Sequence, residues 1–262
     1  MRIIDCHTHI YPDTIAKRGT ESICEFYDLK SDMTGSANVL LDEGKKAGIE
    51  KFLLLPVAVN EKHVRQINEF TRRQINEHPE FFGFATVHPN MEDMLGEVEY
   101  AFDMLSLRGI KIHPDTQRFS IDDKRLYPLY DALQEKGMPI LIHTGDFRYE
   151  YSRPEKLKKI LHEFPHLTVI AAHLGGWSLF DVAYENLKDE NCYLDISSSM
   201  MFISLEEVAG YVHGYGADRV LFGTDFPLWK PEKEVESFMK LDLTDDEREK
   251  IAYRNAEKLF GI

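Results

Sequence analysis

The 262-residue sequence predicts an α/β fold, a single-domain (β/α)8 barrel of the TIM type. Short apolar segments alternate with amphipathic ones along the chain, and eight apolar segments can be counted, the number of strands that closes a TIM barrel. The length agrees, because about 250 residues is typical of one such barrel. We therefore expect residues 1–262 to form one domain.

The candidate strands are short and mostly rich in Ile, Val, Leu and Phe, as strands buried in a parallel sheet are. In chain order they are RIIDCH (2–7), KFLLLPV (51–57), FFGFATV (81–87), RGIKIH (108–113), PILIHT (139–144), LTVIAAH (167–173), CYLDIS (192–197) and RVLFGTD (219–225). The alternative is a doubly wound open sheet. No GxGxxG motif follows the first strand, which removes the commonest sequence support for that alternative.

The candidate helices lie between these strands and carry recognisable end signals. They cover 37–48, 63–78, 122–137, 153–165, 204–214 and 244–261. Gly48 and Gly137 are expected to be C-caps. Ser204 and Glu207 have the spacing of a capping box. The longest connection, about residues 10–36, is expected to form a cap or lid over the site.

Composition and charge narrow the class of protein. The formal net charge is -14 and no long Lys/Arg run exists, which disfavours nucleic acid as a partner. The sequence has no run of about 18 apolar residues, so no membrane span is expected. The N-terminus lacks the pattern of a signal peptide. The three cysteines are scattered and show no CxxC spacing. We therefore expect a cytoplasmic protein whose partner is a small-molecule substrate.

The opening MRIIDCHTHI concentrates polar residues on the first strand. Regular β alternation would place Asp5, His7 and His9 on one face of it, and Ile4 and Cys6 on the other. Two imidazoles a strand step apart could hold one metal ion, although an HxH pattern alone is weak evidence for such a site.

Histidines recur at the C-terminal ends of the strands, where the active site of this kind of barrel lies. Six of the eleven stand there: His7, His9, His88, His113, His143 and His173. Asp225 ends the eighth strand. His88 precedes a proline and is expected to be structural, but chance alone would seldom place imidazoles at so many strand ends.

These strand ends predict a metal centre. His7, His9, His143, His173 and Asp225 should converge on one pocket, and histidine with carboxylate suits zinc and other first-row divalent ions. Such an ion lowers the pKa of a bound water to about 7, and a carboxylate touching that water could move its proton.

The ordered motifs DCHTHI, KIHP, LIHTG, AAHLGG, LFGTDFP and RNAEKLFGI resemble the amidohydrolase superfamily. The branch they resemble most is amidohydrolase family 2, the aminocarboxymuconate-semialdehyde decarboxylase-like metal-dependent hydrolases, and the resemblance covers the whole chain. It implies that His7, His9, His143 and Asp225 bind one metal ion, commonly zinc. It also implies that His173 acts on the metal-bound water or, as in binuclear relatives, binds a second ion. A homodimer is a further expectation, because dimers are frequent in this branch.

Lys111 and His113, two apart at the end of the fourth strand, have three interpretations. The resemblance allows Lys111 to be a carboxylated lysine that bridges two metals. Both residues could instead bind a substrate carboxylate. A purely structural role would pair Lys111 with an acid such as Asp5 or Asp195.

Two further candidates follow strand ends. Arg148 could clamp an anionic substrate, or belong to a solvated loop. Trp229 could form a wall of the substrate site, or pack in the core.

The predicted function is hydrolysis of an amide, ester or lactone by metal-bound hydroxide, with His173 and Asp225 moving protons. The alternative is a non-oxidative decarboxylase acting on a carboxylated aromatic or muconate-like compound through the same metal site. A catalytically inactive binding barrel is opposed by the intact ligand set. A nuclease is disfavoured by the acidity and by the absence of a glutamate on the fourth strand.

Overall fold

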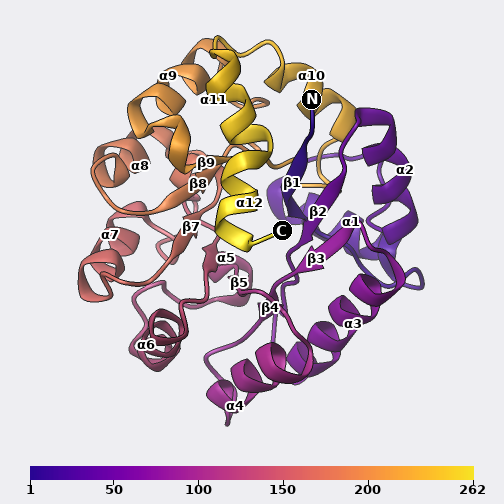
Figure 1. Cartoon of the computed structure of the whole chain (residues 1–262). Coiled ribbons are helices and arrows are strands. Elements are labelled where there is room, and N and C mark those ends of the chain that lie inside the picture. The colour runs from indigo at the N-terminus through magenta and orange to yellow at the C-terminus, as the bar shows by residue number, and fades with distance from the viewer.

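The apolar segments form the strands of a closed parallel barrel with helices around it (Figure 1). The computed structural model describes residues 1–262. The strands are β1 Ile4–Thr8, β2 Lys51–Leu54, β3 Phe81–Gly83, β4 Ala85–Thr86, β5 Ile110–Ile112, β6 Ile140–Ile142, β7 Val169–Ala171, β8 Tyr193–Asp195 and β9 Val220–Leu221. The predicted α/β barrel is confirmed, with strands shorter than the apolar segments that contain them.

Nine labelled strands make eight barrel positions, because the predicted strand 81–87 is interrupted at Phe84. Its first half, β3, pairs with β2, and its second half, β4, pairs with β5. The barrel closes between its first and last strands, where the Cys6 N–H donates to the Phe222 carbonyl at 2.8 Å. All other neighbours are consecutive in the chain, which excludes the doubly wound alternative.

Helices surround the strands, and most of them form a ring outside the barrel wall (Figure 1). They are α1 Ala16–Tyr27, α2 Ala37–Ala47, α3 Val64–Glu77, α4 Met94–Glu99, α5 Pro114–Gln117, α6 Tyr127–Lys136, α7 Pro154–Glu163, α8 Phe180–Leu187, α9 Leu205–Tyr215, α10 Pro231–Phe238, α11 Asp245–Glu249 and α12 Asn255–Phe260. Short 3-10 segments are η1 Glu61–His63, η3 Lys124–Leu126, η4 His173–Gly175 and η5 Ala217–Arg219, and π-helical turns are η2 Tyr100–Met104 and η6 Lys250–Arg254. None of the helices has both the length and the apolar character needed to cross a membrane.

The predicted helix ends are confirmed at the residues that carried the signals. Gly48 and Gly137 end α2 and α6 in the left-handed conformation, which glycine adopts without a steric cost. Ser204 and Glu207 form the predicted capping box of α9.

Side-chain alternation along the strands divides the core into two parts. Ile110, Ile140 and Val169 belong to the larger apolar cluster, which the strands share with the surrounding helices. Leu141 and Ile170, each one position further along its strand, belong to a smaller inner cluster. This alternation lets every second residue at a strand end point into the barrel mouth.

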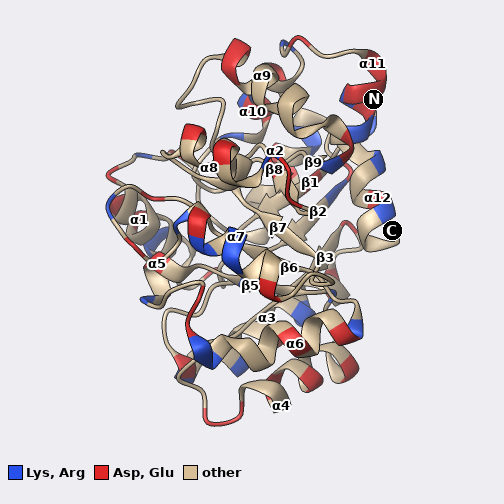
Figure 2. Ribbon diagram, turned by 90° about the vertical axis from the view of Figure 1, so that its left-hand side faces the viewer, with Lys and Arg blue, Asp and Glu red and all other residues tan.

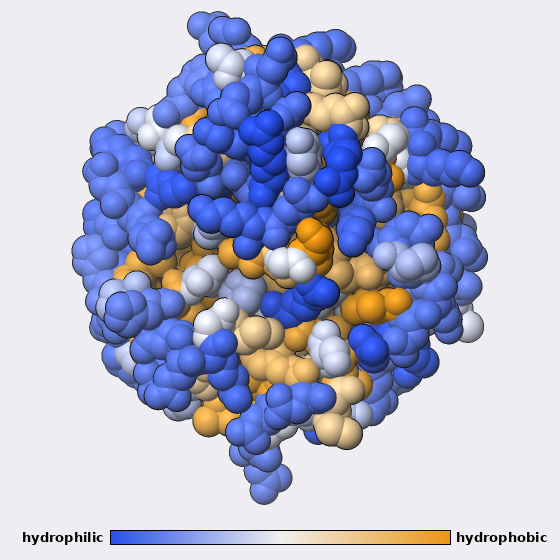
Figure 3. Space-filling model, viewed as in Figure 1, coloured by the Kyte–Doolittle hydropathy of each residue, from blue (hydrophilic) through white to orange (hydrophobic).

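The two ends of the barrel are covered differently. Helix α12 crosses the end nearest the viewer in Figure 1, where Phe260 packs on Phe82 and Phe84. The same face in Figure 3 is largely hydrophilic, with scattered apolar residues. Helix α1 lies at the opposite end, as the side view in Figure 2 shows. The segment predicted as a cap therefore contains a helix, and its action as a lid stays a prediction.

Candidate metal centre and active site

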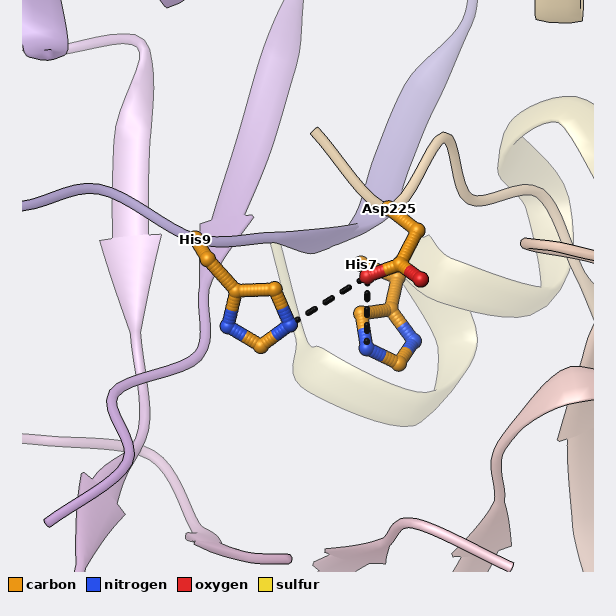
Figure 4. A group of neighbouring side chains, drawn as sticks. All are labelled: His7, His9 and Asp225. Carbon is orange, nitrogen blue, oxygen red and sulfur yellow. Dashed lines mark ion pairs between the residues drawn. The ribbon is translucent and has the colours of Figure 1, made fainter. Parts of the chain in front are cut away.

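Three side chains form a compact group at the C-terminal ends of the first and last strands: His7, His9 and Asp225 (Figure 4). The Asp225 Oδ1 atom lies 3.7 Å from His7 Nε2 and 3.4 Å from His9 Nε2. Ligands held at roughly 2.0–2.2 Å by one ion lie roughly 3–3.6 Å apart at tetrahedral or octahedral angles. Both distances are close to this range, so a small adjustment of the side chains would let the three atoms bind one divalent ion.

Hydrogen bonds to the Nδ1 atoms of His7 and His9 orient both imidazoles so that their Nε2 atoms face Asp225. His7 Nδ1 lies 2.9 Å from Asp195 Oδ2, and His9 Nδ1 lies 2.6 Å from the Leu55 carbonyl oxygen. Each acceptor favours the tautomer with the proton on Nδ1, which leaves the Nε2 lone pair free for a metal. Asp195 therefore lies behind His7 as a hydrogen-bond partner, a contact that sequence reasoning did not predict.

The first strand departs from regular alternation, which corrects one prediction. Its register shifts between Asp5 and Thr8, as a β-bulge does. Asp5 consequently does not share the site with His7, and its carboxylate instead accepts hydrogen bonds from Thr224. Cys6 was predicted to be core on the face away from the metal-bearing side, and it is buried in the inner apolar cluster. The extra residue of the bulge explains why Asp5 and His7 do not share a face.

Asp225 is held by a chain of hydrogen bonds from outside the cavity. The Ser198 hydroxyl donates to Asp225 Oδ2 at 2.5 Å, and Trp229 Nε1 donates to the same hydroxyl at 2.7 Å. Trp229 does not line the cavity. Its expected place in the substrate wall is therefore not observed, and we assign it to the positioning of Asp225.

Backbone strain accompanies these positions. Asp225, Ser198 and His173 have φ values of 58°, 48° and 58°, in the left-handed region that non-glycine residues seldom occupy. Such conformations cluster at functional sites. Gly223, two residues before Asp225, is limited by space instead of by backbone conformation. A Cβ at this position would lie 2.8 Å from His7 Cβ, which is too close.

His143 and His173 form the neighbouring part of the site. His143 Nδ1 lies 3.1 Å from His173 Nε2, whose ring is held by the Ser197 carbonyl at 3.0 Å from Nδ1. The other nitrogen of His143 faces Asp115 Oδ2 at 3.6 Å. His143 therefore groups with His113 and Asp115 in this structure, apart from the compact group of His7, His9 and Asp225. Its predicted role as a metal ligand stays a prediction.

His113 stacks on His143, with ring centroids 3.9 Å apart, and contacts the cap. The Tyr27 hydroxyl of α1 lies 2.7 Å from His113 Nε2. Asp115 is buried, and its Oδ1 atom has no hydrogen-bond partner. Tyr27 and Asp115 were not predicted as site residues. Asp115 follows KIHP by one position, but nothing in the sequence indicates the contact from residue 27 to residue 113.

Lys111 is fully buried in the barrel mouth, with Nζ 3.4 Å from His7 Nε2. It forms no ion pair with Asp5, Asp195 or any other acid within 4.0 Å, so the structural pairing considered for it is not observed. Burial lowers the pKa of Lys111 to about 8, against the opposing effect of Asp195 and Asp225. An ammonium without a carboxylate partner in such a place favours an anionic ligand.

The protonation states of the other site residues suit metal binding. Burial, with Lys111 nearby, lowers the pKa of His7, and burial with His113 holds the pKa of His143 well below its usual value. Burial would raise the pKa of Asp225, but the surrounding histidines hold it well below its ordinary value. Neutral imidazole and ionised carboxylate are the forms that ligate a metal.

Arg148 lies outside the cavity lining, contrary to its expected role as a substrate clamp. Its guanidinium donates to Asp146 at 2.9 and 2.7 Å and to the Phe26 carbonyl of α1 at 2.6 Å. We therefore assign Arg148 to holding α1 in place. His88, expected to be structural, is buried with Nε2 3.2 Å from the Gln117 carbonyl and also lies outside the lining.

A cavity of about 1010 Å³ joins these groups to the solvent. Its inner part is lined by the histidines, Lys111, Asp115 and Asp225, and its outer part by faces of α1 and α3. The fold and the site thus define a class of protein: a (β/α)8 barrel with a histidine–carboxylate centre of metal-binding type at its C-terminal end.

Comparison with known proteins gives the family. The sequence model described as Amidohydrolase matches residues 4–262, so the chain belongs to the amidohydrolase family. The decarboxylase OrsB of Emericella nidulans is 27% identical over 39% of this chain, and the match spans 37% of that relative. The gamma-resorcylate decarboxylase of Polaromonas sp. is 22% identical over 76% of each chain.

A solved structure with the same fold is a dihydroxybenzoic acid decarboxylase from Polaromonas sp., described with bound manganese and the inhibitor 2-nitroresorcinol. It has a TM-score of 0.76 and 18% identity, and the match covers 99% of this chain and 96% of that one. The expected family and fold are therefore confirmed.

Proposed function

We propose that this chain is a metal-dependent, non-oxidative decarboxylase that acts on a hydroxylated aromatic carboxylic acid. The observation that carries the proposal is the buried Lys111 ammonium beside the donor group, with no carboxylate of the protein to neutralise it. The relatives named as decarboxylases support this alternative over the predicted hydrolysis of an amide, ester or lactone.

The reaction needs no oxidant. The carboxylate leaves as CO2, the electron pair of the broken C–C bond stays on the ring carbon, and one proton is delivered to that carbon. A protein that performs it must bind an anion, orient a flat ring and hold a proton donor next to one carbon atom.

His7, His9 and Asp225 are the residues that would hold the metal, and we propose His143 as a further ligand after a shift of its ring. A divalent ion bound there would supply positive charge that holds and polarises an anionic substrate. Zinc was the expected metal, whereas the solved structure of similar fold is described with manganese. Elemental analysis of the purified protein distinguishes the two ions.

The remaining residues have separate tasks. Lys111 Nζ would bind a substrate carboxylate oxygen, because it is a buried donor with no acid partner. His173 would take up a proton on Nε2 and pass it to the ring carbon, because its Nδ1–H donates to the Ser197 carbonyl and leaves the Nε2 lone pair free. Asp225 is the second candidate for moving the proton. Tyr27 and the stacked rings of His113 and His143 would border a flat ring on the cap side.

The proposal is tested with protein loaded with manganese or zinc and given 2,6-dihydroxybenzoate, with benzoate as the matched compound without hydroxyls. Release of CO2 together with resorcinol, reduced in Lys111→Met, is the expected result. Hydrolysis of a lactone or amide panel, with no CO2 from any hydroxybenzoate, would contradict it.

A further inference from the structure

The arginines of the chain divide into two groups. Of thirteen in the sequence, nine donate to acids or backbone carbonyls of the protein: Arg2, Arg65, Arg108, Arg125, Arg148, Arg153, Arg219, Arg248 and Arg254. The other four, Arg18, Arg72, Arg73 and Arg118, have neither an ion pair nor a hydrogen bond. Three of these four, all except Arg72, line the cavity that leads to the metal centre.

The three cavity arginines come from three separate elements. Arg18 lies on α1, Arg73 on α3, and Arg118 directly follows α5. Arg118 has a φ of 61°, a left-handed conformation for which glycine or asparagine is the usual choice. The chain thus carries a long cationic side chain at a position whose backbone conformation favours glycine or asparagine.

The charge of the cavity is opposite to that of the protein. Its lining contains these three arginines and Lys111, and only Asp115 and Asp225 as acids, whereas the whole chain carries a formal net charge of -14. Guanidinium groups in a cleft that have no acid or carbonyl partner attract carboxylates and phosphates, which they bind in a planar, two-pronged geometry.

The size of the cavity leaves room for more than one ring. Its volume of about 1010 Å³ is at the upper end of the roughly 300–1,000 Å³ typical of small-molecule sites. The cavity lining also includes apolar side chains, with Ile23 of α1 and Ile67 and Phe70 of α3 among them.

We propose that the physiological substrate carries a second anionic group, separated by an apolar or aromatic portion from the carboxylate at the metal centre, and that Arg18, Arg73 and Arg118 recognise this second group. The inference deepens the proposed function and rests on it for the first carboxylate. The second group is a carboxylate or a phosphate, which share the same guanidinium chemistry.

The test measures binding, so it does not depend on turnover. Titration calorimetry on the metal-loaded protein compares 4-hydroxybiphenyl-3-carboxylate with the same compound carrying a 4′-carboxylate, and with its 4′-phosphate. We expect one of the doubly anionic probes to bind at least about tenfold more tightly than the singly charged one. Equal affinity of all three probes would overturn the proposal.

Arginine variants test whether the three cavity arginines cause the tighter binding of the doubly anionic probe. Replacing Arg18, Arg73 and Arg118 together by Gln should abolish the preference for the doubly anionic probe and leave the affinity for the singly anionic probe within about twofold, since the arginines act only on the second charge. Arg72→Gln is the matched control, because Arg72 is also unpaired but does not line the cavity. A preference that survives the triple variant, or that is lost equally in Arg72→Gln, would overturn the assignment. Absence of CO2 release from every probe would contradict the proposed function and leave this binding result standing.

Discussion

Glu234 on α10 offers a prediction whose size can be worked out from the structure. Its side chain is fully buried, and neither carboxylate oxygen has a hydrogen-bond partner. Burial, with smaller contributions from Asp225 and Asp5, raises the pKa of Glu234 from 4.5 to about 8. The folded protein therefore keeps a proton on Glu234 that the unfolded chain releases above about pH 4.5.

The sign and size of the effect follow from this proton. Between pH 4.5 and 8 the unfolded state binds fewer protons, so the contribution of Glu234 to stability falls by about 1.4 kcal/mol per pH unit. From pH 4.5 to pH 7 the loss is about 3 kcal/mol, and above pH 8 it is constant. Glu234→Gln has no proton to lose, so the variant should gain this amount over the parent at pH 7.

Urea unfolding of parent and variant at pH 5, 6, 7 and 8 measures the difference. We expect a small gain in the free energy of unfolding at pH 5 that grows steadily toward pH 8. Glu236→Gln is the control, because Glu236 lies on the same helix but is exposed and paired with Lys233, and no such growing gain is expected from it. A Glu234→Gln gain that does not change with pH, or a less stable variant at pH 8, would refute the reasoning.

Four further predictions concern the site. Asp225→Asn should weaken metal binding, measured by elemental analysis, and lower kcat by roughly 10²–10⁴-fold, because a ligand charge and a proton carrier are both lost. His173→Ala should keep one ion per chain yet lose most turnover; loss of one of two bound ions would contradict a mononuclear centre. Lys111→Ala should raise KM with unchanged metal content, whereas a fall in metal content would indicate a bridging carbamate. Gly223→Ala should reduce metal affinity at equilibrium dialysis, because its Cβ would displace His7; unchanged affinity would show that the strand adjusts.

The barrel and the place of the site could be predicted because both depend on local patterns. Strand-length apolar runs indicated the eight barrel positions, and the C-terminal ends of those runs placed His7, His9 and Asp225 at one end of the fold. Helix ends were equally predictable where a single residue decides them, as Gly48 and Gly137 do.

The rest depends on contacts that local patterns do not contain. The bulge in β1 adds one residue to the register and separates Asp5 from His7, and no alternation rule anticipates it. Tyr27 meets His113 across 86 residues of sequence. Arg148 and Trp229 have the right residue types for substrate contact, but their partners, Asp146 and Ser198, direct them to supporting roles.

Decarboxylation at a protein-bound divalent metal is the central claim, and one isotope measurement tests it most directly. Metal-loaded protein is incubated in D2O with 2,6-dihydroxybenzoate labelled with carbon-13 in the carboxyl group, and the products are followed by mass spectrometry. We expect labelled CO2 and resorcinol with one deuterium on the carbon that lost the carboxylate, both abolished when the metal is removed and restored when it is returned. Intact substrate together with hydrolysis of an ester, amide or lactone by the same metal-loaded protein would contradict it.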